Sequence, residues 1–140
     1  MRKRTEILCQ ELNSIADFDQ FAEQNAEQFQ TDSASEILRA AVRRSGIRKA
    51  ELARRSGMSE VYLHQILSGR RTPSRNRVLA LCLALGMDVG ETNELLKKCA
   101  YAALYVRLRR DAAVHYALEH GWSVYELDEK LLDLGEETLL

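Results

Sequence analysis

The sequence has few of the residues that interrupt helices. Its 140 residues include one proline and seven glycines, which excludes collagen-like chains and argues against turn-rich all-β folds. No apolar run approaches the ~18 residues that a membrane-spanning helix needs, so we expect no membrane partner. The three cysteines, Cys9, Cys82 and Cys99, are too widely spaced for a disulfide framework. They predict reduced, mostly buried thiols and a cytoplasmic location.

Residue combinations typical of metal or catalytic sites are also missing. The histidines His64, His115 and His120 are scattered, and no two cysteines have the short spacing of a zinc site. The sequence shows no glycine-rich phosphate loop and no order of residues typical of a nucleophilic triad. We therefore expect no metal, no cofactor, no catalytic residue and no enzymatic activity.

Charge is distributed unevenly along the chain. The composition is 46% hydrophobic and 29% charged, typical of a soluble globular protein, and the net charge is −1. Residues 36–75 carry ten basic and three acidic side chains, whereas residues 113–140 carry one basic and seven acidic ones. The basic segment indicates a surface that binds a polyanion, and the alternative interpretation is a solvated helical surface.

Apolar residues at intervals of three and four, divided by N-cap residues and glycines, predict an all-α chain of eight or nine helices. Two serines, Ser59 and Ser74, are expected to cap the helices that follow them. Two capping boxes are expected, at Asp88 with Glu91 and at Ser123 with Glu126.

Residues 48–66 predict two short helices that cross closely. Ala53 is small enough to lie at the crossing, and Gly57 allows the turn four residues later. Leu63 and Ile66 follow at positions that face back onto the first helix. Each position has a separate steric reason, so the pattern indicates a helix-turn-helix.

The segment from residue 35 to residue 99 resembles the phage-repressor-like helix-turn-helix domain, the XRE family of bacterial transcriptional regulators. The matching features are Gly46, Glu51-Leu52-Ala53, Gly57-Met58-Ser59 and the segment Gly69-Arg70-Arg71-Thr72-Pro73-Ser74. The resemblance implies a five-helix DNA-binding domain over 35–99. A helical N-terminal arm, 1–34, would precede it and a helical C-terminal extension, 100–140, would follow.

The resemblance also implies a site for double-stranded DNA. The second helix of the pair, residues 59–68, would lie in the major groove. The implied base contacts are Glu60, Val61, Tyr62 and Gln65. The implied phosphate contacts are Lys49, Arg70, Arg71, Ser74 and Arg75. Two positions depart from the family pattern: Lys49 stands where glutamine is frequent, and the carboxylate of Glu60 repels phosphate unless it meets a base donor.

Two questions of assembly stay open. A single helix-turn-helix reads only a few base pairs, so we expect a homodimer on DNA. The candidate interface is an apolar stripe in the C-terminal helices, with Trp122 as a candidate addition: Val124, Leu127, Leu131 and Leu134. The alternative is that this stripe closes the chain's own core.

An alternative function keeps the fold but uses it as a protein–protein interaction module.

Overall fold

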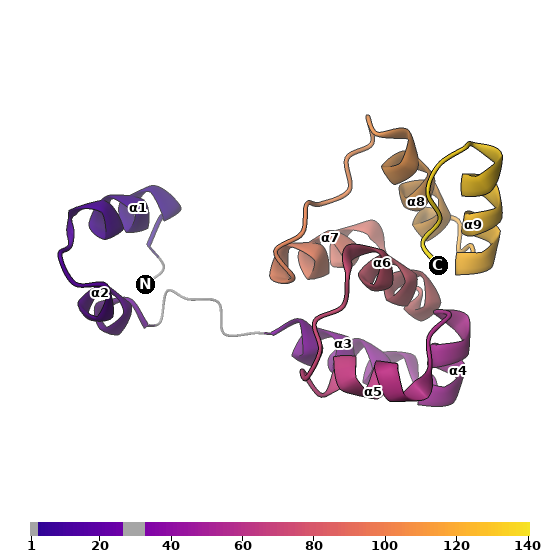
Figure 1. Ribbon diagram of the computed structural model, residues 1–140, viewed down its shortest axis with the longest axis horizontal. Coiled ribbons are helices and arrows are strands. Elements are labelled where there is room, and N and C mark those ends of the chain that lie inside the picture. Colours follow the sequence, from indigo (N-terminus) through magenta and orange to yellow (C-terminus); the bar gives the residue numbers. More distant parts are fainter. Residues whose placement is uncertain (1–2, 27–32) are drawn as a thin grey trace. The chain divides into compact units, whose positions relative to one another are not determined.

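The computed structural model describes residues 3–26 and 33–140, and all regular structure within these ranges is helical. The all-α fold class is therefore confirmed. Nine helices lie in the described residues, and the chain divides into two compact units, 1–31 and 32–140. Figure 1 shows the helices of each unit.

The first unit contains α1 (Thr5–Ser14) and α2 (Phe18–Gln24). The Asp17 carboxylate accepts a hydrogen bond from the Asp19 N–H and caps α2. The Lys3 ammonium joins the two helices, because it donates to both the Glu11 carboxylate and the Asn25 side-chain oxygen. Residues 1–2 and 27–32 of the arm expected over 1–34 lie outside the described residues.

The second unit begins with the five helices expected for the helix-turn-helix domain. They are α3 (Ala34–Ser45), α4 (Lys49–Arg55), α5 (Glu60–Leu67), α6 (Arg75–Leu85) and α7 (Val89–Lys98). Two further helices, α8 (Arg109–Glu119) and α9 (Val124–Asp133), complete this unit.

The expected helix starts are confirmed at four of these helices. The Ser59 and Ser74 hydroxyls cap α5 and α6, and both expected capping boxes form, at the starts of α7 and α9. At α3 the hydroxyl of Ser33 caps the helix by accepting a hydrogen bond from the Glu36 N–H.

One apolar core joins α3 to α9. The expected helix-crossing residues are buried in it, as are the neighbouring leucines of α6: Leu52, Ala53, Leu63, Ile66, Leu79 and Leu81. Helix α6 is central, because it packs against α3, α4, α7, α8 and α9. The cores of the helix-turn-helix segment and of the C-terminal extension are therefore continuous.

The apolar stripe of the C-terminal extension faces this core. Val124, Leu127 and Leu131 are each fully buried within the single chain, and Leu134 is half-buried. Three of the four side chains expected at a dimer interface are therefore already covered by their own chain.

The last residues of the chain also contribute to the unit. Leu139 is buried, and its N–H donates to the Asp128 carboxylate. The Leu140 side chain lies so close to Gly57 that a Cβ atom at this glycine would meet it at 2.6 Å. The C-terminal segment therefore reaches the turn between α4 and α5.

The thiols differ in exposure. Cys82 is buried, Cys99 is half-buried and Cys9 is exposed, so the expectation of mostly buried thiols is wrong for Cys9. Burial raises the pKa of Cys82 to about 12, which keeps this thiol protonated and unreactive. Within 3–26 and 33–140, no helix is long and apolar enough to cross a membrane.

Candidate nucleic-acid interface

The turn between α4 and α5 depends on Gly57. Its φ of +68° lies in the left-handed region, where a side chain would strain the backbone. The Met58 N–H donates to the Ala53 carbonyl at 3.0 Å, which closes the end of α4. The Arg77 guanidinium donates a hydrogen bond to the Gly57 carbonyl, so a residue in the first turn of α6 stabilises the turn. Two short helices are thus fixed against each other around one glycine.

Helix α5 exposes one of its faces to solvent. Glu60, Val61 and His64 are exposed, Val61 to 69%, and Gln65 is half-buried. Positions three and four apart share one helix face, so the His64 imidazole stands beside Glu60 and Val61. Sequence reasoning did not include His64 among the site residues, although this spacing could have identified it.

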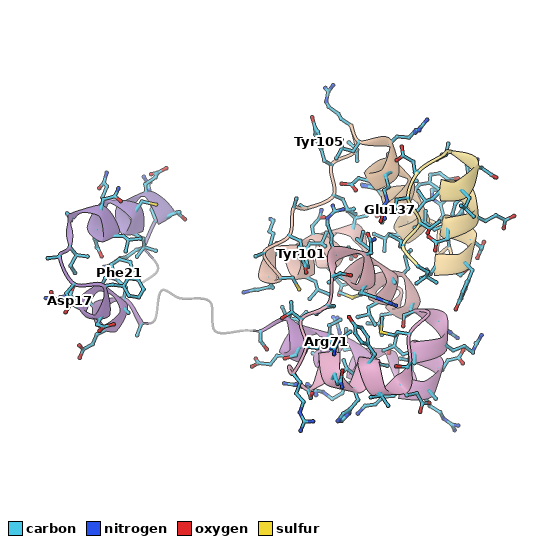
Figure 2. The ribbon with its side chains drawn as sticks, viewed as in Figure 1. Asp17, Phe21, Arg71, Tyr101, Tyr105 and Glu137 are labelled. Carbon is cyan, nitrogen blue, oxygen red and sulfur yellow. The ribbon has the colours of Figure 1, made fainter. Side chains whose placement is uncertain are left out.

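The loop after α5 holds two exposed arginines close to the helix. The N–H groups of Arg70 and Arg71 both donate to the Gln65 carbonyl, at 3.0 and 3.2 Å. The Arg71 guanidinium lies 5.1 Å from the centre of the Tyr62 ring, and that of Arg77 lies 5.3 Å from it. Figure 2 shows Arg71 beside α5. The Tyr62 ring thus holds two cations beside α5.

Tyr62 itself is less exposed than Glu60 and Val61. Its side chain is half-buried and packs against the apolar core. The structure therefore brings Glu60 and Val61 together on the open face of α5 and places Tyr62 at its edge.

A basic groove lies between α3 and α5. Arg39 and Arg43 from α3, Lys49 from α4 and His64 from α5 line its polar side, and its volume is about 380 Å³. The Arg39 guanidinium also donates to the Leu67 carbonyl at the end of α5. The sequence analysis included only Lys49 among these four side chains, because nothing in the sequence pairs α3 with α5 across more than twenty residues.

The first turns of α4 and α6 differ in how they are capped. Arg48 precedes α4 and makes no side-chain cap bond within the described residues, so the amides near Lys49 lack such a cap. At α6 the Ser74 hydroxyl accepts from the Arg77 N–H. Ser74 is exposed, as the expected phosphate contact requires.

Arg75 has a partner inside the protein. Its guanidinium donates two hydrogen bonds to the Asp111 carboxylate, at 3.2 and 3.1 Å, and a third to the Ala102 carbonyl. The side chain of Asp111 is 5% exposed and that of Arg75 is 24% exposed. The Arg75 guanidinium is thus bound within the protein, whereas its backbone N–H lies at the start of α6.

An ion-pair cluster occupies the exposed side of α4. The Glu51 carboxylate accepts hydrogen bonds from Arg54 and from Arg55. These bonds, that of Arg54 first, lower the pKa of Glu51 to about 2. Glu51 therefore stays ionised and partly neutralises these two arginines at neutral pH.

One comparison with known proteins identifies this region. Residues 35–95 match the family described as the helix-turn-helix domain, and they contain helices α3 to α7 almost completely. No curated protein and no solved structure matches the chain.

No group of three or more metal-binding side chains occurs in the described part of the chain. The match of residues 35–95 supports DNA binding by this segment in general. Residues 35–95 are therefore similar to a helix-turn-helix domain, and the α4–turn–α5 geometry agrees with this similarity.

Proposed function

We propose that this chain is a sequence-specific DNA-binding transcriptional regulator that places α5 in the major groove of double-stranded DNA. The observation that carries the proposal is the open face of α5, with Glu60, Val61 and His64 exposed and the basic side chains of Arg70 and Arg71 next to it. A helix presented in this way can bring side chains to base edges while flanking cations meet the phosphates.

The proposed base contacts are Glu60, Val61 and Gln65, with Tyr62 at the edge of the face. Glutamine matches the donor and acceptor of adenine, glutamate can accept from the cytosine amino group, and valine can contact the thymine methyl. The proposed phosphate contacts are Lys49, Arg70, Arg71 and Ser74. Arg75 is proposed as a phosphate contact through its backbone N–H at the start of α6, because Asp111 binds its guanidinium.

The salt dependence of DNA binding tests the phosphate contacts. We expect Arg70→Gln to reduce the slope of log affinity against log salt by about one unit and to leave base preference unchanged. Arg107→Gln is the matched control, because Arg107 is an exposed arginine in the loop before α8. A change in the preferred sequence in Arg70→Gln would instead assign base reading to this residue.

The base preference of variants tests whether α5 reads the DNA sequence. Gln65→Ala is expected to weaken binding to the best site by about 1–3 kcal/mol and to relax preference at one or two base pairs. Glu60→Ala separates two roles of the carboxylate. Loss of discrimination at one base pair indicates a contact with the cytosine amino group, whereas tighter binding to every sequence indicates that the carboxylate only repels phosphate. If both variants bind every sequence as the parent does, α5 does not read DNA, and the protein–protein interaction alternative replaces the proposal.

We also propose that two copies bind DNA as a two-fold pair, since one α5 reads only a few base pairs. The buried stripe on α9 is not available for this contact in the folded chain. Sedimentation at micromolar concentration, with and without DNA that contains two half-sites, measures the stoichiometry. A monomer that footprints a single half-site would exclude the pair.

A further inference from the structure

An apolar groove runs along α8 on a part of the fold that the proposed DNA contacts do not use. Its volume is about 490 Å³, and its floor is formed by Ala112 and Ala113. These small side chains are half-buried, and they leave space between the larger residues on either side. A groove of this size and composition is typical of sites for small organic molecules.

Aromatic side chains form one end of the groove. Tyr116 of α8 is 50% exposed, and its ring meets the Trp122 ring edge to face, with 5.3 Å between centroids. The His120 ring stacks on the Tyr116 ring, with centroids 3.8 Å apart. The ring contacts fix the position of Tyr116, so this end of the groove is preformed and apolar.

The other end carries positive charge. Arg109 of α8 and Lys130 of α9 both line the groove. Arg109 is already bound to the Glu136 carboxylate and the Leu134 carbonyl. Lys130 is exposed, and no carboxylate of the described residues lies within ion-pair distance of it. The groove thus offers an available cation beside an apolar surface.

We infer that the α8–α9 groove binds a small amphipathic organic anion, whose charged group meets Lys130 and whose apolar body lies over Ala113 toward Tyr116 and Trp122. The exposed Lys130 ammonium, which lines the groove and has no carboxylate of the described residues within ion-pair distance, argues for an anion over a neutral or cationic ligand. The volume of about 490 Å³ lies in the range of sites for small molecules.

The chain carries a built-in reporter for this site, because Trp122 is its single tryptophan. Three probes of equal chain length are compared on the full chain: octanoate, octan-1-ol and octylamine. We expect octanoate to change Trp122 fluorescence saturably and to bind more tightly than octan-1-ol, with octylamine weakest. Equal binding of the anion and the amine, or no saturable change with octanoate, would overturn the inference.

Two variants locate the binding. Lys130→Gln is expected to weaken octanoate binding about fivefold and to leave octan-1-ol unchanged, as the loss of one exposed ion pair predicts. Lys97→Gln, at an exposed lysine on α7, is the control and should bind both probes as the parent does. Unchanged octanoate binding in Lys130→Gln would exclude this lysine as the anion contact.

Ala113→Leu fills the groove and is expected to weaken both octanoate and octan-1-ol at least about tenfold, because the added side chain occupies their space. Circular dichroism confirms that the variant is folded; if it is not, Ala112→Leu replaces it. Undiminished binding in a folded variant would place the site elsewhere. A Trp122 emission that shifts with protein concentration in the absence of probe would assign the groove to a second copy of the chain and overturn the inference.

Discussion

Asp111 shows how one side chain links distant parts of the second unit. It is buried in the first turn of α8, where a negative charge is favoured by the helix dipole. Its carboxylate accepts two hydrogen bonds from Arg75 at the start of α6 and one from the Tyr105 N–H. The ion pair therefore fixes both α8 and the loop before it. Figure 2 shows Tyr105 at the far end of this unit from Arg71.

Asp111→Asn tests this role. The variant keeps the shape of the side chain but leaves the Arg75 guanidinium without its counter-charge in a half-buried position, so we expect a loss of about 3 kcal/mol in the free energy of unfolding. Urea denaturation measures it. Glu94→Gln removes an exposed pair with Lys97 and should cost less than about 0.5 kcal/mol. Equal effects in the two variants would contradict the structural role of Asp111.

Glu51 predicts a specific dependence of stability on acid. Arg54 and Arg55 lower its pKa from 4.5 to about 2, so the folded state favours the ionised form. The stabilisation is complete above pH 4.5 and is lost as the pH falls toward 2. We therefore expect the melting temperature of Glu51→Gln to lie below that of the parent at pH 7 and to approach it near pH 2. A difference that stays constant over this range would contradict the prediction.

At the scale of the helices, local signals predicted most of what the structure shows. The caps at Ser59 and Ser74 and the two capping boxes act within four residues, and each was identified correctly. Contacts between distant segments were not identified. The pair of Arg75 with Asp111 and the groove shared by Arg43 and His64 join residues more than twenty positions apart, and a single sequence carries no signal for them.

The close contact where α4 crosses α5 leads to a prediction about the packing of these two helices. Ala53 is 3% exposed at the contact, so Ala53→Leu should overpack it and lower the free energy of unfolding by about 1–3 kcal/mol. Ala50→Leu places the same side chain at an exposed position of α4 and is expected to change stability by no more than about 0.5 kcal/mol. Thermal and urea denaturation compare the two. An Ala53→Leu variant as stable as Ala50→Leu would refute the proposed packing of the crossing.

At the scale of the molecule, the second unit combines two surfaces around one core. Figure 1 shows α5 and α8 on different sides of α6. The residues expected to contact DNA surround α5, whereas the apolar groove lies between α8 and α9. Their cores are continuous through α6, so the C-terminal extension supports the helix-turn-helix domain through packing.

A substitution at Leu139 tests whether the helix-turn-helix segment and the C-terminal helices share one core. Leu139 is 4% exposed and belongs to the common core, although it lies in a segment outside any helix. Leu139→Ala is expected to lower the free energy of unfolding by about 2–3 kcal/mol, because it removes buried methyl groups and leaves a cavity. Leu132→Ala provides the control, since Leu132 is 68% exposed on α9 and its truncation should cost no more than about 0.5 kcal/mol. Amide hydrogen exchange adds the decisive measurement: protection should fall in α6 as well as α9 in Leu139→Ala, since the two helices share this core. Loss of protection confined to the last residues would show that the end of the chain does not stabilise the helix-turn-helix domain.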